Sequence, residues 1–232
     1  MSTFACCLFL PPEAGNFIPN AGDCLLRVEM TCHHTADAAC GRKNFMCDQR
    51  LTEKLLDKQV VFPGKIIRLE HWQVELPNGS HALREVACHP GASAVVALDD
   101  RGQVILVRQH RIAVDRLTLE IPAGKLDSAG EDPFVCAQRE LSEETGLSAA
   151  TWQKLTCLET TPGFCNERIH IYLATGLSEG ACHPDDDEFV DVVRMPLEEA
   201  VRRVMDGSFR DGKTMVGLLM AQKLLSSTPT ND

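Results

Sequence analysis

The sequence lacks several features that would place the chain in particular classes of protein. No apolar run approaches the roughly 18 residues that a membrane-spanning helix needs, so no membrane association of that kind is expected. The histidines and cysteines of the first 47 residues include no Cys-x-x-Cys pair, the spacing that is typical of structural zinc sites. No basic residue precedes the short apolar run at the N-terminus, which argues against a secretory signal peptide.

An excess of positive charge is also lacking. The chain has 23 Lys and Arg against 33 Asp and Glu, a net charge of -10, and such a field does not attract nucleic acid or anionic membranes. If the protein handles a phosphate compound, it needs local cations or a bound metal. The 11 cysteines are odd in number and have no paired spacing, which argues against a disulfide framework and favours a reducing, cytoplasmic location.

The first 45 residues differ from the rest of the chain, because Gly, Pro, Asn and Cys interrupt every apolar cluster. We expect 1–45 to be a disordered extension and 46–232 to form one domain. Two alternatives remain open: translation of the natural protein begins at Met46, or the extension is a metal-binding or partner-binding module. Length and hydrophobic content allow one sizeable core in the remainder.

From Val60 the pattern predicts short strands followed by two helices, an α+β protein. Alternating apolar residues predict hairpins at 65–88 and 93–110, with turns at "PNGS" and "DDRG". Further strands are expected at 116–124, 152–160, 168–175 and 188–195, and helices at 196–207 and 213–227.

An additional helix is predicted at about 133–145, because Asp132 and Pro133 form a start signal and Gly146 is a natural stop. It carries Glu140, Glu143 and Glu144 on one face. Like charges at this spacing cost a few tenths of a kcal/mol, and two of them lie at the helix end that disfavours anions. A divalent cation would offset that cost, and hard oxygen ligands suit Mg²⁺. The three glutamates are therefore interpreted as a metal cradle.

This stretch resembles the Nudix box, G-x5-E-x7-R-E-U-x-E-E-x-G-U with U aliphatic. From Glu131 to Leu147 the match is complete, and one extra residue, placed in "DSAG", separates Gly124 from Glu131. The resemblance implies a mixed β-sheet in an α/β/α sandwich, with the box as loop-helix-loop. It also implies an enzyme that uses Mg²⁺ or Mn²⁺ and an activated water to hydrolyse a nucleoside diphosphate linked to another group.

Carried over residue by residue, the resemblance makes Glu140 and Glu144 the leading metal ligands. Glu143 follows closely, and the Ala123 carbonyl is a further ligand. Glu143 and Glu144 thereby belong to the catalytic centre. Arg139 and Glu131 are expected to form an ion pair that braces the loop.

The flanking sequence is similar to the ADP-ribose pyrophosphatase branch of this family. The segments that carry the similarity are "LEIPAGKLD", "LVRQHR", "REVACHPG" and "TTPGFCNERIHIYLA". They imply that Arg84 and Arg108 bind substrate, and that Glu120 and Glu167 contact its polar groups. Each of these four has a structural alternative: a surface ion pair for the arginines and a purely structural role for the acids.

The acidic stretch "HPDDDEF" just before the last strand is either a solvated loop or the carrier of a general base. In related pyrophosphatases a loop here bears a catalytic acid, and Glu188 is the first choice, ahead of Asp187 and Asp186. Family members are commonly homodimers. In such a dimer, the resemblance allows Arg84 to bind substrate in the active site of the other subunit.

The sequence therefore predicts a Mg²⁺-dependent hydrolase that cleaves ADP-ribose to AMP and ribose 5-phosphate. The nearest alternative is the same chemistry on another nucleoside diphosphate sugar, such as GDP-mannose or ADP-glucose. A second alternative is a sensor that binds nucleotide without turnover, although the complete glutamate set argues against it.

Overall fold

The structure is a computed structural model that describes residues 48, 50–128, 130–180 and 189–227. Within these ranges the chain forms two β-sheets, three α-helices and one short 3-10 helix. The domain boundary predicted between residues 45 and 46 lies outside the described residues. None of the helices in these ranges has the length and hydropathy that crossing a membrane requires.

The first sheet is antiparallel, with the strand order β1-β2-β3. Its strands are β1 (Lys54–Pro63), β2 (Arg68–Glu75) and β3 (His81–Cys88). The hairpin predicted at 65–88 is confirmed as β2 and β3. Strand β1 was not expected, and every one of its residues is exposed. The sequence therefore gave no alternation of buried and exposed positions there, which is the usual signal for a strand.

The second sheet has seven strands, with the main order β10-β5-β4-β9-β8 and with β6 on β5 and β7 on β4. It is mixed, because β4 and β9 run parallel while the other pairs are antiparallel. The strands are β4 (Ala92–Leu98), β5 (Gln103–Arg111), β6 (Arg116–Glu120), β7 (Ala123–Lys125), β8 (Leu147–Glu159), β9 (Arg168–Glu179) and β10 (Asp191–Pro196). The 3-10 helix η1 (Ile112–Val114) connects β5 to β6.

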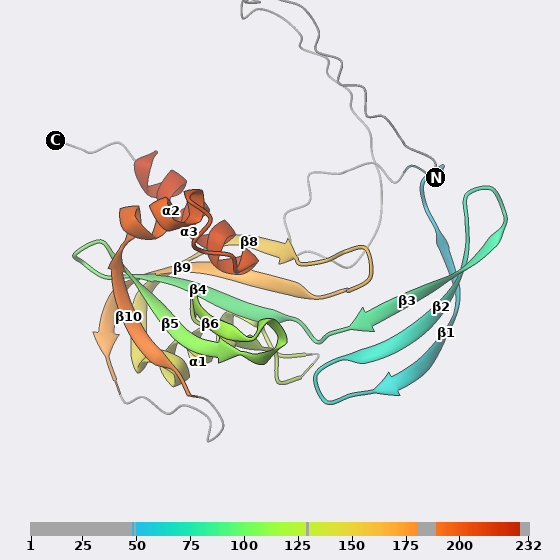
Figure 1. Ribbon diagram of the computed structural model, residues 1–232, viewed down its shortest axis with the longest axis horizontal. Coiled ribbons are helices and arrows are strands. Elements are labelled where there is room, and N and C mark those ends of the chain that lie inside the picture. Colours follow the sequence, from blue (N-terminus) through green and yellow to red (C-terminus); the bar gives the residue numbers. More distant parts are fainter. Residues whose placement is uncertain (1–47, 49, 129, 181–188, 228–232) are drawn as a thin grey trace, which may run out of the picture. The chain divides into compact units, whose positions relative to one another are not determined.

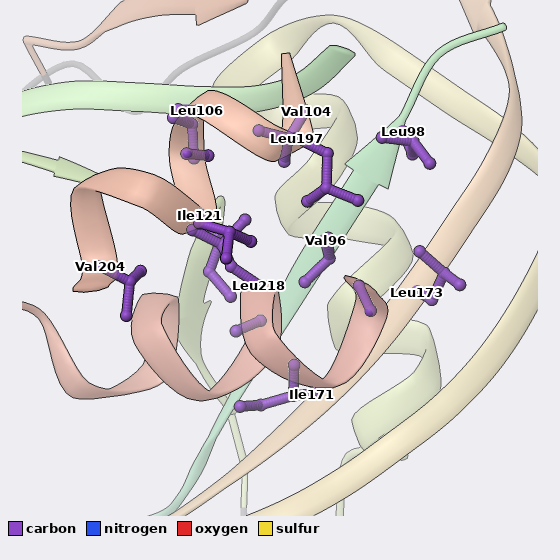
Figure 2. Packing of buried hydrophobic residues seen from close by; sticks show 14 of the residues in the cluster. Val96, Leu98, Val104, Leu106, Ile121, Ile171, Leu173, Leu197, Val204 and Leu218 are labelled. Atoms are coloured by element: carbon purple, nitrogen blue, oxygen red, sulfur yellow. The ribbon is translucent and has the colours of Figure 1, made fainter. Parts of the chain in front are cut away.

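Helices cover both faces of this second sheet, α1 (Pro133–Thr145) on one and α2 (Leu197–Met205) with α3 (Gly212–Ser226) on the other (Figure 1). Successive residues of β4 point to opposite faces, as in any strand. Val95 belongs to the core beneath α1, whereas Val96 belongs to the core beneath α2 and α3. Figure 2 shows this second core, in which Val96, Ile171 and Leu218 come from β4, β9 and α3. The predicted α/β/α sandwich is therefore confirmed.

Two backbone hydrogen bonds join the end of the first sheet to the second. The Ala87 N–H donates to the Phe164 carbonyl at 2.8 Å, and the Asn166 N–H donates to the Ala87 carbonyl at 3.2 Å. They hold the end of β3 beside the turn between β8 and β9. This junction walls a cavity described below.

Candidate active site

Helix α1 begins and ends where the sequence predicted. The Asp132 carboxylate accepts a hydrogen bond from the Phe134 N–H at 2.8 Å, and Pro133 occupies the first helical turn. At the other end Gly146 has a φ of +69° and donates its N–H to the Ser142 carbonyl at 2.8 Å. Both signals fix the register of the helix, so the acidic residues near its C-terminus face a defined partner.

That partner is the loop between β6 and α1. Glu140 and Glu144 are buried, with relative exposures of 7% and 2%. The Glu144 Oε2 accepts the Ala123 N–H at 2.9 Å. A Cβ added to Gly124 would lie 2.1 Å from the Glu140 carboxylate, so a side chain there would displace that carboxylate. The residue next to Ala123 must therefore be glycine if Glu140 is to reach the loop.

Arg139 connects this loop to the glutamates. Its Nη1 donates to Glu140 Oε1 at 2.6 Å and to Glu143 Oε2 at 2.9 Å. Its Nη2 donates to the Lys125 carbonyl at 3.2 Å, and its Nε lies 3.4 Å from Glu131 Oε1. Burial lowers the pKa of Arg139, but the surrounding carboxylates, Glu140 first, outweigh that effect and raise it above its ordinary value. The expected Arg139–Glu131 ion pair is present, and Arg139 also pairs with Glu140 and Glu143.

The extra residue in the box does not separate the loop from the helix. Near the position predicted for the extra residue, the Asp127 N–H donates to Glu131 Oε2 at 2.6 Å and the Glu131 N–H donates to the Ser128 carbonyl at 3.2 Å. Ala123 and Gly124 keep their contacts with the two buried glutamates. The contacts between the loop and the helix are therefore present although the box is one residue longer than the family pattern.

The oxygen donors of this site determine whether it fits a divalent cation. Among the described residues no three His, Cys, Asp or Glu side chains already converge as a metal cluster. Glu140 and Glu143 turn toward Arg139 and Glu144 turns toward the Ala123 N–H, and each of these contacts satisfies negative charge. The possible ligands are nevertheless all hard oxygens. Two of the carboxylates, Glu140 and Glu144, are buried beside the segment that carries the Ala123 carbonyl. That chemistry fits Mg²⁺ or Mn²⁺.

A second polar cluster surrounds Glu120, which is 3% exposed and lies three residues before Ala123. The Arg111 guanidinium donates to its two oxygens, at 2.9 Å each, and the Thr118 hydroxyl donates to Oε1 at 2.7 Å. The Lys213 ammonium also contacts Oε2. Burial alone raises the pKa of Glu120, but the hydrogen bond from Arg111 and the charge of Lys213 outweigh it and lower the pKa to about 2. The carboxylate is therefore ionised at neutral pH.

This cluster forms one side of a cavity of about 550 Å³. Arg111, Glu120 and Lys213 line it together with two further arginines, Arg116 and Arg210. Four cationic side chains around one cavity supply the local positive charge that a phosphate compound needs in an acidic protein.

A larger cavity of about 900 Å³ lies at the junction of the two sheets. Trp72 and Arg84 reach it from the first sheet, and His89 and Phe164 from the connecting turns. Glu167 lines both cavities. The aromatic and charged walls of this cavity suit a base and a sugar.

The structure brings some of the expected substrate residues to these cavities but not all of them. Glu120 and Glu167 line the smaller cavity, and Arg84 lines the larger one, paired with Glu53 at 2.5 Å. Arg108 lines neither cavity; its exposed side chain pairs with Asp191 of β10 at 2.5 Å. This arrangement fits the alternative that Arg108 forms a surface ion pair. Glu188 lies outside the described residues, as do Asp186 and Asp187.

Sequence reasoning missed Arg111, for which a signal was available. In the pairing of β5 with β6, Val107 lies opposite Glu120, Gln109 opposite Thr118 and Arg111 opposite Arg116. Since alternate residues share a face, Arg111 lies on the side of Glu120, whereas Arg108 lies on the other side. With the turn placed at 112–115, so that Arg111 pairs with Arg116, alternation along the two strands would have chosen Arg111 over Arg108. Lys213 comes from a distant helix, and no local pattern points to it.

Comparison with known proteins supports the resemblance to the Nudix family. The NUDIX domain model matches residues 88–215. The chain is 44% identical to the "ADP-ribose pyrophosphatase" of Bacillus subtilis over 74% of this chain and 94% of that protein. It is 41% identical to the "Methanol dehydrogenase activator" of Bacillus methanolicus over 73% of this chain and 92% of that protein. A solved structure titled "Crystal structure of ADP compounds hydrolase" superposes with a TM-score of 0.67 at 24% identity, covering 76% of this chain and 96% of the other, which supports the fold. With the box, the buried glutamates and the sandwich in agreement, the chain belongs to the Nudix family.

Proposed function

We propose that this protein is a Nudix hydrolase that cleaves the diphosphate of ADP-ribose to AMP and ribose 5-phosphate. The observation that carries the proposal is the pair of buried carboxylates, Glu140 and Glu144, held against the Ala123–Gly124 loop beside a cavity lined by cations. The similarity to an ADP-ribose pyrophosphatase along almost its whole length supports the choice of substrate.

The cation implied by this site is Mg²⁺, with Mn²⁺ as the alternative. Glu140, Glu143 and Glu144 would hold it, together with the Ala123 carbonyl. When bound, it would neutralise the diphosphate and lower the pKa of the attacking water. In the structure Glu140 and Glu143 pair with Arg139 and Glu144 accepts the Ala123 N–H, and these contacts hold the three carboxylates in place.

The remaining roles follow from position. Arg111 presents a guanidinium to the smaller cavity and is suited to an anionic oxygen of the diphosphate. Glu167, which lines both cavities, is suited to accept hydrogen bonds from sugar hydroxyls. Arg84 and Trp72 line the larger cavity and are suited to the nucleoside. Glu188 remains our proposal for the general base, as a carboxylate in the loop before β10.

We further propose that the protein acts as a homodimer, and that 46–232 is the catalytic domain. Large apolar side chains are exposed along β1 and the segments on either side of it, including Val60, Phe62 and Ile66 at 50%, 57% and 61%. A strand exposed on both faces with such side chains is suited to pairing with a second copy. The described cysteines, Cys88, Cys136, Cys157 and Cys165, form no disulfide with one another, in keeping with the reducing compartment proposed here.

The test is hydrolysis of ADP-ribose, GDP-mannose, ADP-glucose and NADH with Mg²⁺ by the wild type and by Glu144→Gln. Glutamine still accepts the Ala123 N–H but carries no charge, so the variant removes the metal ligand and keeps the fold. We expect ADP-ribose to be cleaved fastest, and the variant to lose activity by about 100-fold or more. Glu198→Gln, an exposed acid in the first turn of α2, is the matched control and should act like the wild type.

Preference for another nucleotide sugar would keep the chemistry and replace the substrate. Nucleotide binding without turnover of any compound in the panel would instead support the sensor alternative. Loss of activity in Glu198→Gln as large as in Glu144→Gln would contradict the assignment of the cradle.

A further inference from the structure

The first turn of α3 is fastened to the segment that leads into the metal-binding loop. The Lys213 ammonium contacts Glu120 Oε2 and lies 3.1 Å from Asp211 Oδ1. Next to it, the hydroxyl oxygen of Thr214 accepts the Ile121 N–H at 2.9 Å, and that hydroxyl donates to Asp211 Oδ2 at 2.6 Å. Thr214 is fully buried and the Lys213 side chain is 10% exposed. Lys213 is therefore held in a fixed place, unlike a surface lysine.

The arrangement of charges around Glu120 affects how a diphosphate would bind. Glu120 is shared by two cations, Arg111 on one side and Lys213 on the other. Arg111 uses its Nε and Nη2 on Glu120, and its Nη1 has no hydrogen-bond partner among the described residues. The Arg111 side chain is 44% exposed and lines the smaller cavity. Its unused edge is thus available to an anion.

Without Lys213, the one charge on Glu120 would neutralise the one charge on Arg111. With Lys213 present, the same carboxylate is divided between two cations, and a net positive charge remains toward the cavity. Asp211 offsets this effect only in part. Its Oδ1 lies 3.1 Å from Lys213, but its Oδ2 caps α3, where it accepts the Thr214 N–H at 3.0 Å and the Thr214 hydroxyl at the positive end of the helix.

We propose that Lys213 is a positioning residue for substrate binding, which holds Glu120 so that the charge and the free edge of Arg111 face the diphosphate. The inference rests on the proposed function and deepens it. Lys213 itself is almost buried and acts through Glu120 and Arg111. It should therefore affect how tightly the anion binds much more than how fast bound substrate reacts.

The experiment compares the wild type with Lys213→Met, Lys213→Arg and a matched control, Lys223→Met. Lys223 lies in the last turn of the same helix and is exposed, so its variant removes the same charge from the same element. Two quantities are measured with Mg²⁺ present: KM and kcat for the preferred substrate, and the Kd of inorganic diphosphate by calorimetry. The Kd does not depend on which nucleotide sugar is the substrate, so failure of the ADP-ribose assignment and failure of this inference are distinguishable.

For Lys213→Met we expect KM and the diphosphate Kd to rise by about tenfold while kcat changes by less than about threefold. Lys213→Arg should restore most of the binding, because it keeps the cation, and Lys223→Met should bind like the wild type. Unchanged binding in Lys213→Met, a loss confined to kcat, or no rescue by arginine would each overturn the proposal.

A second variant decides the matter if Lys213→Met fails to fold. Asp211→Asn keeps an equally good helix cap but removes the carboxylate that competes for Lys213. It should tighten diphosphate binding by a few-fold. Binding in Asp211→Asn that is equal to or weaker than in the wild type would overturn the proposal.

Discussion

At the scale of single residues, the closest approach in the site is that of Gly124 to Glu140. Since a Cβ at this position would lie 2.1 Å from the Glu140 carboxylate, Gly124→Ala must push that carboxylate away from the loop. We expect a loss of activity of tenfold or more and a loss of about 1–3 kcal/mol in the free energy of unfolding. Kinetics and urea titration measure the two effects.

The control for this substitution lies in the same loop. A Cβ at Gly130 would meet nothing within 4 Å, so Gly130→Ala should leave activity unchanged. Equal losses in both variants would mean that the loop needs flexibility in general, and would contradict the close contact as the cause.

The second residue with a measurable signature is Glu120. Its pKa is about 2 in the folded protein against an ordinary value of 4.5, because Arg111 and Lys213 outweigh its burial. Above pH 4.5 the stabilisation is fully present. As the pH falls from 4.5 toward 2, the unfolded carboxyl binds a proton before the folded one does, and on the order of 3 kcal/mol is lost.

Glu120→Gln cannot titrate at this position. The wild type should therefore lose more stability than the variant between pH 5 and pH 2.5, although the variant is less stable at neutral pH because two cations lose their partner. Urea unfolding at a series of pH values measures both slopes. If stability falls equally with pH in the two proteins, Glu120 is not responsible for the loss of stability at acid pH.

Residues also show where sequence reasoning reached its limit. Glu120, Glu140 and Glu144 could be chosen from the sequence because motifs carry them. Arg108 and Arg111 are both arginines of one short segment, and only the pairing of β5 with β6 separates them. Lys213 is 93 residues away from Glu120, so their contact exists only after the sheet and α3 have packed.

At the scale of elements, α1 was predictable at both ends because its signals are local. One of these signals is the Asp132 cap, whose carboxylate accepts the Phe134 N–H. Asp132→Ala removes that hydrogen bond and should lower the free energy of unfolding by about 1 kcal/mol. Asp132→Asn keeps the acceptor and should be nearly neutral. Chemical denaturation measures both, and an equal loss in the two variants would assign the effect to charge instead of capping.

Strand β1 was not predictable for the opposite reason. Its ten residues are all exposed, so burial imposes no alternation on "KLLDKQVVFP", and its pairing with β2 includes two irregularities of register. In the second sheet, β4 and β5 were predictable because their burial leaves long apolar runs. Sequence patterns report burial, so a strand that is exposed along its whole length gives a weak pattern.

At the scale of the whole molecule, the two layers of helix explain how the site is assembled. The face of β4 toward α1 anchors the helix that carries the glutamates, and the opposite face anchors α3, which carries Lys213 and Thr214. The segment 120–124 crosses between them and contacts both: Glu120 and Ile121 bind α3, while Ala123 and Gly124 meet α1. Sandwich and site therefore depend on each other.

The exposed apolar surface of β1 leads to the prediction for the assembly. If this strand pairs with a second copy, Phe62→Lys places a charge in the interface and should weaken the dimer by tenfold or more, with the mass in solution shifting toward that of one chain. Met205→Lys changes an apolar residue that is 74% exposed at the end of α2, outside the first sheet, and should leave the dimer intact. Light scattering after size exclusion, across a range of concentrations, measures both. A wild type that has the mass of one chain at micromolar concentration would contradict the dimer, and Met205→Lys dissociating as readily as Phe62→Lys would contradict β1 as its interface.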